Sequence, residues 1–221
     1  MPVKRLKVVS VVDALSSALA DAIYRMEYLP GQQITESEIT TQFGVSRNTV
    51  REAIAGLLNC GLFMKEPNRG IFVKKITEND VREIFHFRAM LESEAVRLII
   101  RRGAIPPELI QAVEQIEKDP FVLDDWYHFV SSDVDFHREL VQASGSRRLV
   151  RLYETIRMEL MLCLCQSKET LLHNNKNMYE HREFIEVLQK GNEEEAVKLV
   201  CNHIQYGVEN LARGFRQEVQ A

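Results

Sequence analysis

Four residues with metal-ligating side chains lie on apolar helical stripes in the C-terminal part of the chain. Asp133 and His137 are spaced i, i+4, which places both on one face of a helix, one turn apart. His181 and His203 occupy similar stripes in two later segments. A buried carboxylate is costly unless it is paired or bound to a metal. Three imidazoles and one carboxylate suit zinc, nickel, manganese or iron, so the pattern predicts a divalent metal ion inside a helical bundle. Each histidine taken alone would instead indicate a hydrogen-bonded structural residue.

Arg88 and Glu92 share the apolar face of another helical segment, residues 77–102. A cation that points into a protein core needs an anion. One interpretation is an internal ion pair between the two side chains, which are one turn apart. The other is that Arg88 binds an organic carboxylate, using the two-pronged geometry of its guanidinium. We favour the second, because the predicted metal would provide another anchor for the same ligand.

Residues 43–54 carry the pattern of a helix-turn-helix. Gly44 permits the tight turn, and Ser46 is a good N-cap for the helix that follows. The first turn of a recognition helix meets base edges in the major groove, where arginine suits guanine and asparagine suits adenine. The predicted DNA contacts on this helix are Ser46, Arg47, Asn48, Thr49 and Arg51.

Two short strand-like runs follow, at residues 62–65 and 71–74, with a hairpin turn at residues 66–70 between them. Helices followed by a hairpin are typical of a winged helix-turn-helix. Asn68, Arg69 and Gly70 at the wing tip are further predicted DNA contacts, because glycine permits close backbone approach and arginine suits a narrow groove.

Helical patterns account for most of the remaining chain, so the predicted fold class is mainly α. Residues 11–26 and 35–43 precede the recognition helix, and residues 1–75 form a winged helix-turn-helix domain. Residues 76–221 are predicted to form an all-α antiparallel bundle that holds the candidate effector site. Its helices are expected at residues 77–102, from 106 onward, and at 122–143, 147–167, 177–190 and 193–215.

Composition is that of an ordinary globular protein, with 45% hydrophobic and 27% charged residues among 221. The net charge of −4 is divided unevenly: residues 1–75 hold 10 Lys+Arg against 7 Asp+Glu, and the remainder holds 18 against 25. This asymmetry favours an N-terminal domain that contacts DNA and a C-terminal domain that is acidic. No apolar run is long enough for a membrane span, and a cytoplasmic location is expected. The four cysteines have no framework spacing, and we expect them to be reduced and mostly buried, with a redox switch as the alternative.

Taken together, these motifs resemble the GntR family of bacterial transcription regulators, in the branch with the all-helical FCD effector domain. The resemblance covers about residues 10–215. The order and spacing of the motifs are together more specific than any single motif. With six expected bundle helices, the chain is similar to the smaller, VanR-like members of the FadR-type branch. The motifs that carry it are residues 43–54, 67–73, 87–92, 133–137, 180–182 and 202–204.

The resemblance implies a homodimer that binds double-stranded DNA at an inverted-repeat operator. It also implies a divalent metal ion in the bundle and a small carboxylic acid as effector. We therefore expect a regulator rather than an enzyme, with no membrane partner. The alternatives are a regulator that senses metal alone, a bundle that serves only for dimerisation, and a metalloenzyme in which the metal activates water.

Overall fold

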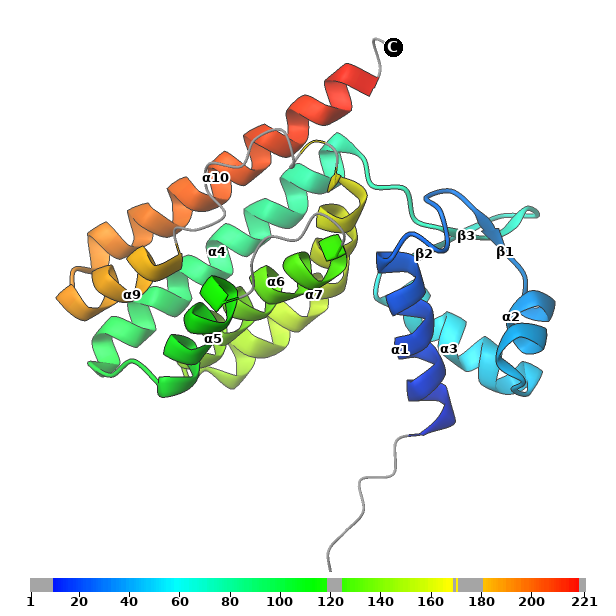
Figure 1. Ribbon diagram of the computed structural model, residues 1–221, viewed down its shortest axis with the longest axis horizontal. Coiled ribbons are helices and arrows are strands. Elements are labelled where there is room, and N and C mark those ends of the chain that lie inside the picture. Colours follow the sequence, from blue (N-terminus) through cyan, green and yellow to red (C-terminus); the bar gives the residue numbers. More distant parts are fainter. Residues whose placement is uncertain (1–9, 119–124, 169, 171–180, 219–221) are drawn as a thin grey trace, which may run out of the picture. The chain divides into compact units, whose positions relative to one another are not determined.

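The structure is a computed structural model that describes residues 10–118, 125–168, 170 and 181–218 (Figure 1). The chain divides into two compact units, Met1–Lys75 and Ile76–Ala221. Helices dominate both units, as the sequence predicted. Among the described residues, no helix is both long enough and apolar enough to cross a membrane.

The first unit contains three helices and a small sheet. The helices are α1 (Val11–Tyr24), α2 (Glu36–Phe43) and α3 (Arg47–Asn59). The strands are β1 (Gln33–Ile34), β2 (Phe63–Glu66) and β3 (Gly70–Val73), and they form an antiparallel sheet in the order β1-β3-β2. α3 packs against α1, α2 and β2. The sequence patterns did not predict β1, which is only two residues long.

Local side-chain contacts explain where α2 and α3 begin. Thr35 and Glu38 form a capping box at the start of α2. Gly44, with φ of 65°, ends α2 in the left-handed conformation that glycine adopts without strain. Ser46 then caps α3 by accepting a hydrogen bond from the backbone of Thr49. These caps fix the turn between the two helices.

The second unit is an all-α bundle. Its helices are α4 (Glu78–Arg102), α5 (Pro107–Lys118), α6 (Trp126–Ala143), α7 (Arg147–Gln166), α9 (His181–Lys190) and α10 (Glu193–Glu218). α4 and α10 lie side by side (Figure 1), and α4 also contacts α6, α7 and α9. α4 is therefore the central helix that meets each of the helices bearing metal-ligating residues.

Two of the expected helix starts fall outside the described residues. Of the helix predicted at residues 122–143, the part from Trp126 is observed, and of that predicted at 177–190, the part from His181 is observed. The sequence predicted six bundle helices, and the VanR-like subgroup was inferred from that number. Both predictions depend partly on residues 171–180, which are not among the described residues.

The cysteines differ partly from expectation. Cys163 and Cys165 are buried in α7, and burial raises the pKa of the Cys165 thiol to about 12. Cys60 is half-buried and Cys201 is exposed. Two of the four cysteines are therefore buried, and Cys201 departs from the expectation, although its Sγ lies 3.5 Å from the Ser93 hydroxyl of α4.

Candidate metal centre and nucleic-acid interface

Side chains from three helices of the bundle meet at one point. α6 contributes Asp133 and His137, α9 contributes His181, and α10 contributes His203. One ligand atom from each lies within 4.8 Å of the others. The centroids of the three imidazole rings are 5.1, 5.3 and 5.4 Å apart. The structure thus brings together all four residues that the sequence nominated as metal ligands.

Several ring nitrogens in this cluster are buried without a hydrogen-bond partner among the described residues. They are His137 Nε2, His203 Nδ1 and both ring nitrogens of His181. His181 Nε2 lies 3.1 Å from Asp133 Oδ1, but without the alignment of a hydrogen bond. Buried polar atoms of native proteins are nearly always satisfied. Imidazole nitrogens and a carboxylate oxygen are also preferred ligands of borderline divalent metals. The donor set therefore fits a divalent cation.

Glu92 orients one of these histidines from the neighbouring helix α4. It is fully buried, and its Oε2 lies 2.8 Å from His137 Nδ1. Its Oε1 accepts a 2.8 Å hydrogen bond from Arg88 Nε and a longer one, 3.5 Å, from the Tyr153 hydroxyl. The other ring nitrogen, His137 Nε2, then faces Asp133 and lies 3.9 Å from its Oδ1. A carboxylate that holds the second nitrogen of a histidine is the usual support of a metal-ligating imidazole.

Charge and burial keep this cluster in the protonation states that a cation needs. Burial raises the pKa of Asp133, but the neighbouring histidines outweigh it, and the net pKa lies well below the ordinary value. Burial also raises the pKa of Glu92, and His137 and Arg88 outweigh it in the same way. Burial lowers the pKa values of His137 and His203. These shifts favour the ionised form of the two carboxyl groups and the neutral form of these two imidazoles, relative to the isolated side chains.

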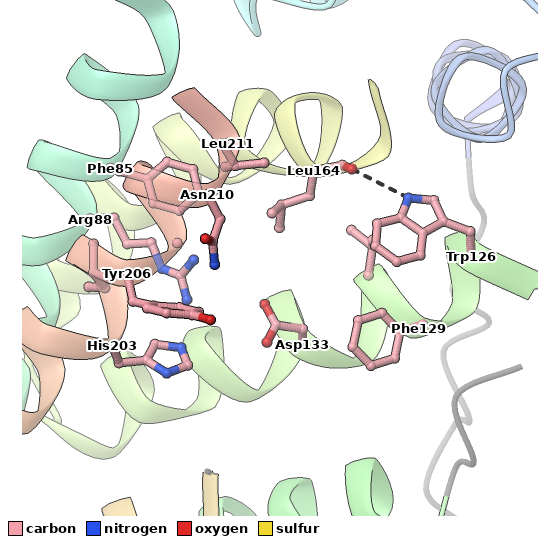
Figure 2. A pocket seen from close by; sticks show the side chains of 13 residues that line it. Phe85, Arg88, Trp126, Phe129, Asp133, Leu164, His203, Tyr206, Asn210 and Leu211 are labelled. Atoms are coloured by element: carbon pink, nitrogen blue, oxygen red, sulfur yellow. Dashed lines mark hydrogen bonds between the residues drawn. The ribbon is translucent and has the colours of Figure 1, made fainter. Parts of the chain in front are cut away.

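A cavity of about 90 Å³ borders the cluster (Figure 2). Arg88, which is 3% exposed, reaches it from α4. Its Nε is used by Glu92, but its Nη2 is buried without a hydrogen-bond partner in the described chain. Both interpretations of Arg88 therefore have a basis: it forms the internal pair and still has a donor left for a ligand. The polar residues that line the cavity are Arg88, Asp133, His203, Tyr206 and Asn210.

Sequence reasoning missed three features of this site. Glu92 appeared only as a partner for Arg88, and its bond to His137 was not foreseen because it joins helices far apart in the chain. Tyr153, buried in α7, has no pattern that indicates a contact with Glu92. Asn210 lies on the same face of α10 as His203, seven residues on, and this spacing is the signal that could have identified it.

The first turn of α3 presents polar side chains to solvent. Ser46, Arg47 and Asn48 are exposed and Thr49 is half-buried, whereas Val50 is fully buried. Arg51 is also exposed, but its Nε donates to both carboxylate oxygens of Glu36 in α2, at 3.0 and 2.9 Å. No sequence pattern indicated this ion pair, which holds Arg51 against the preceding helix α2. Arg47 has no such partner among the described residues.

The hairpin between β2 and β3 is built around two positive φ angles, 60° at Asn68 and 115° at Gly70. Arg69 pairs with Glu66 and lies 5.4 Å from the centre of the Phe72 ring. Its backbone carbonyl accepts a 2.8 Å hydrogen bond from Gln33 Nε2 in β1. The three predicted wing-tip residues thus form one tight turn, which β1 braces.

Comparison with known proteins assigns the two units. The family model of the gntR family of bacterial regulatory proteins matches residues 12–73, and that of the FCD domain matches residues 83–206. The HTH-type transcriptional regulator YdhC of Bacillus subtilis (strain 168) is 29% identical over 196 residues, which cover 87% of each chain. The HTH-type transcriptional repressor RspR of Escherichia coli (strain K12) is 26% identical over 193 residues, covering 86% of this chain and 83% of that protein.

Among solved structures, a GntR transcriptional regulator from Rhodococcus sp. RHA1 superposes with a TM-score of 0.77 at 25% identity, covering 92% of this chain and 98% of that one. The matched families and relatives are transcription regulators, not enzymes. The chain is therefore a DNA-binding transcription regulator that belongs to the GntR family of bacterial regulatory proteins, in the branch with a C-terminal FCD domain.

Proposed function

We propose that this regulator is a homodimer in the cytoplasm whose operator affinity is controlled by a small organic carboxylate, bound between Arg88 and a divalent metal ion in the bundle. One observation carries the proposal. Four buried or partly buried ligands on three helices converge, and a buried, unsatisfied guanidinium nitrogen borders the same cavity. The metal would be held by Asp133, His137, His181 and His203. When bound, it would supply a Lewis acid that attracts the carboxylate.

The chain's own residues account for binding and orientation of the acid. Arg88 keeps Nη2 for the ligand while Glu92 fixes its Nε, so the guanidinium is positioned before the acid arrives. Burial alone would lower the pKa of Arg88, but Glu92 outweighs it and the net pKa is raised, so the side chain stays cationic. An anion that pairs with it would satisfy a charge-assisted hydrogen bond.

α4 is the helix that could pass an effector signal to the DNA-binding unit. It carries Arg88 and Glu92, and its first residue, Glu78, follows the end of the first unit by three positions. Ile76, between them, is buried, and its backbone donates a 2.9 Å hydrogen bond to Gln166 of α7. The acid can change DNA affinity only by binding two arrangements of the dimer unequally.

The proposal of a homodimer is supported by exposed apolar side chains on α4 and α7. Phe87 and Met90, one turn apart on α4, are 54% and 55% exposed, and Leu152 on α7 is 54% exposed. The two helices pack against each other. Large exposed apolar side chains that gather on one face commonly mark an interface.

For contact with the operator, we propose the first turn of α3 and the tip of the hairpin. Ser46, Arg47, Asn48, Thr49 and Arg51 would enter the major groove. Asn68, Arg69 and Gly70 would approach the neighbouring backbone or minor groove. Exposure of the α3 side chains and the tight hairpin turn support this assignment.

The test is a titration of operator DNA with the full-length chain, after the operator has been selected from a random duplex pool. Affinity is measured by fluorescence anisotropy for protein stripped of metal and for protein loaded with Zn²⁺, Ni²⁺ or Mn²⁺, each with and without a panel of small carboxylates. We expect at least one acid to change operator affinity in a metal-loaded form only. A response to metal but to no acid would identify a metal sensor, and no response to either would leave the bundle as a dimerisation module.

A further inference from the structure

An ion pair joins the two helices of the helix-turn-helix. Arg51, on α3, has a side chain that is 61% exposed, and that of Glu36, the first residue of α2, is 36% exposed. The Nε of Arg51 donates to both carboxylate oxygens of Glu36, at 3.0 and 2.9 Å. An exposed ion pair of this kind adds little to stability. It does, however, decide what the arginine can still bind, because the carboxylate occupies one nitrogen of the guanidinium.

The nitrogens that remain on Arg51 match the edge of a guanine base. An arginine guanidinium is a planar fork of N–H donors, and with Nε directed at Glu36, the donors of Nη1 and Nη2 are left for another partner. Two adjacent donors of such a fork fit the O6 and N7 acceptors that guanine presents in the major groove. Arg51 lies one turn after Arg47 on α3, so both arginines lie on the same face of the helix.

The charge of the pair favours a base over a phosphate as the partner of Arg51. Residues that anchor the DNA backbone act through their positive charge, which neutralises phosphates and releases counterions. Arg51 and Glu36 together carry no net charge, and the carboxylate of Glu36 would repel a phosphate beside it. A base edge is instead recognised by the geometry of hydrogen bonds. The pair is therefore suited to reading a base and poorly suited to anchoring the backbone.

Local contacts hold both ends of the pair in place. The capping box of Thr35 and Glu38 fixes the first turn of α2, where Glu36 lies. The N-cap Ser46 fixes the start of α3, which carries Arg51. A long side chain loses rotamer freedom when a partner immobilises it. Because Glu36 already holds Arg51 in one orientation, part of this cost is met before DNA binds.

We propose that Glu36 is a positioning residue for base recognition, which holds the Arg51 guanidinium so that Nη1 and Nη2 bind one guanine in each operator half-site. The inference rests on the proposed function, in which α3 enters the major groove. Without the carboxylate of Glu36, the Arg51 side chain is free to turn to a phosphate. Preference for guanine then falls, while affinity for unrelated DNA rises.

The experiment is a fluorescence-anisotropy titration of the full-length chain on its selected operator, on the single-base variants of that operator, and on a random duplex of equal length. Glu36→Gln keeps the shape of the side chain and removes its charge. We expect the preference for guanine over the other bases at one position of the half-site to fall by about tenfold. Affinity for the random duplex should rise and become more dependent on salt.

Glu52→Gln is the matched control. It removes the same charge from an exposed position of α3, next to Arg51 in the sequence, and should leave the preference for guanine unchanged. If Glu36 only stabilised α2, its replacement would weaken binding to every duplex by the same factor. A Glu36→Gln protein that keeps the preference for guanine would therefore overturn the inference.

Variants of Arg51 separate a failure of this inference from a failure of the proposed function. Arg51→Lys keeps the positive charge but lacks the planar fork, so it should lose the preference for guanine and keep its affinity for the random duplex. Adding Glu36→Gln to Arg51→Lys should reduce the preference no further, because both changes remove the same contact. Two additive losses, or a loss in Arg51→Lys alone, would refute the role of Glu36. The proposed entry of α3 into the groove fails as well only if Arg47→Gln also leaves operator binding unchanged.

Discussion

At the scale of single residues, the site depends on what each polar atom does with its hydrogen-bonding capacity. Glu92 uses one oxygen for Arg88 and the other for His137, so the cation and the metal-ligating histidine are both fixed by one carboxylate. The atoms that remain unsatisfied, Arg88 Nη2 and His137 Nε2, are those that a ligand and a metal would take. Glu92 therefore links the ion pair with Arg88 to the candidate metal site at His137.

Glu92→Gln tests this link. The amide keeps the shape but leaves the Arg88 charge buried without its anion, so we expect the free energy of unfolding to fall by about 3–5 kcal/mol. Zn²⁺ affinity should fall by about 10–100-fold, because His137 loses its supporting carboxylate. Chemical denaturation measures the free energy of unfolding, and competition with a chelator measures Zn²⁺ affinity. Glu94→Gln, on the same helix but about half exposed, is the control and should change neither; a Glu92→Gln protein with normal affinity would disprove the supporting role.

Arg47→Gln tests the proposed base contact. Because Arg47 is exposed and has no ion-pair partner in the described residues, the change should leave stability unaltered and weaken operator binding by about 1–3 kcal/mol, with relaxed specificity at one base pair. The measurement is anisotropy against the operator and its single-base variants. Arg148→Gln, an exposed arginine of α7, serves as the control. Uniform weakening on all sequences would indicate a phosphate contact instead.

At the scale of elements, much of the structure could be predicted because helix periodicity and caps are local. Thr35, Ser46 and Thr77 begin α2, α3 and α4 as N-caps, and the i, i+4 spacing of Asp133 and His137 was enough to place both on one face. Periodicity cannot tell which part of an inward face borders empty space, so the cavity was not predicted. Contacts between distant helices, such as Glu92 with His137, and the two-residue β1 depend on tertiary packing that no local pattern records.

At two glycines of the first unit, substitution by alanine should change stability in opposite directions. Gly70 has φ of 115°, and a Cβ there would come within 2.9 Å of Gln33 Nε2. We expect Gly70→Ala to lower the free energy of unfolding by about 1–3 kcal/mol and to weaken operator binding. Gly56 is helical with open space around it, so Gly56→Ala should raise stability by about 0.5–1 kcal/mol. Thermal and chemical denaturation compare the two; equal effects would refute the role assigned to the hairpin turn.

At the scale of the whole molecule, the two units differ in chemistry. The first carries a small excess of basic residues and the second a larger excess of acidic ones, which suits a DNA-binding unit and a separate effector unit. α4 links these roles in sequence, since it follows the first unit directly and carries Arg88. Metal and effector should therefore act first on the bundle.

Hydrogen exchange can locate this action. Because a ligand stabilises the elements that bind it, saturating Zn²⁺ should slow amide exchange around Asp133, His181 and His203 and in the adjoining part of α4. Exchange in α1, α2 and α3 should stay unchanged with metal alone. Mg²⁺, which prefers oxygen ligands, is the control and should have little effect. Protection that appears first in α3 would contradict the assignment of the metal to the bundle.

The proposed dimer depends on the apolar surface of α4 and α7. Phe87→Glu combined with Met90→Glu should shift the protein from dimer to monomer in sedimentation velocity and weaken operator binding, because a buried unpaired carboxylate is costly at an interface. Leu29→Glu changes an equally exposed side chain, 58% exposed, in the first unit and should keep the dimer. A double variant that remains dimeric would show that the interface lies elsewhere.

The most direct test of the central claim is metal stoichiometry by native mass spectrometry combined with elemental analysis. The purified chain, loaded with Zn²⁺ and dialysed, should retain one ion per chain. Asp133→Asn and His181→Gln should lose it while remaining folded, and His128→Gln, which changes an exposed histidine of the same helix as Asp133, should retain it. A chain that binds no divalent ion, or variants that keep theirs, would contradict the claim that these side chains share one metal.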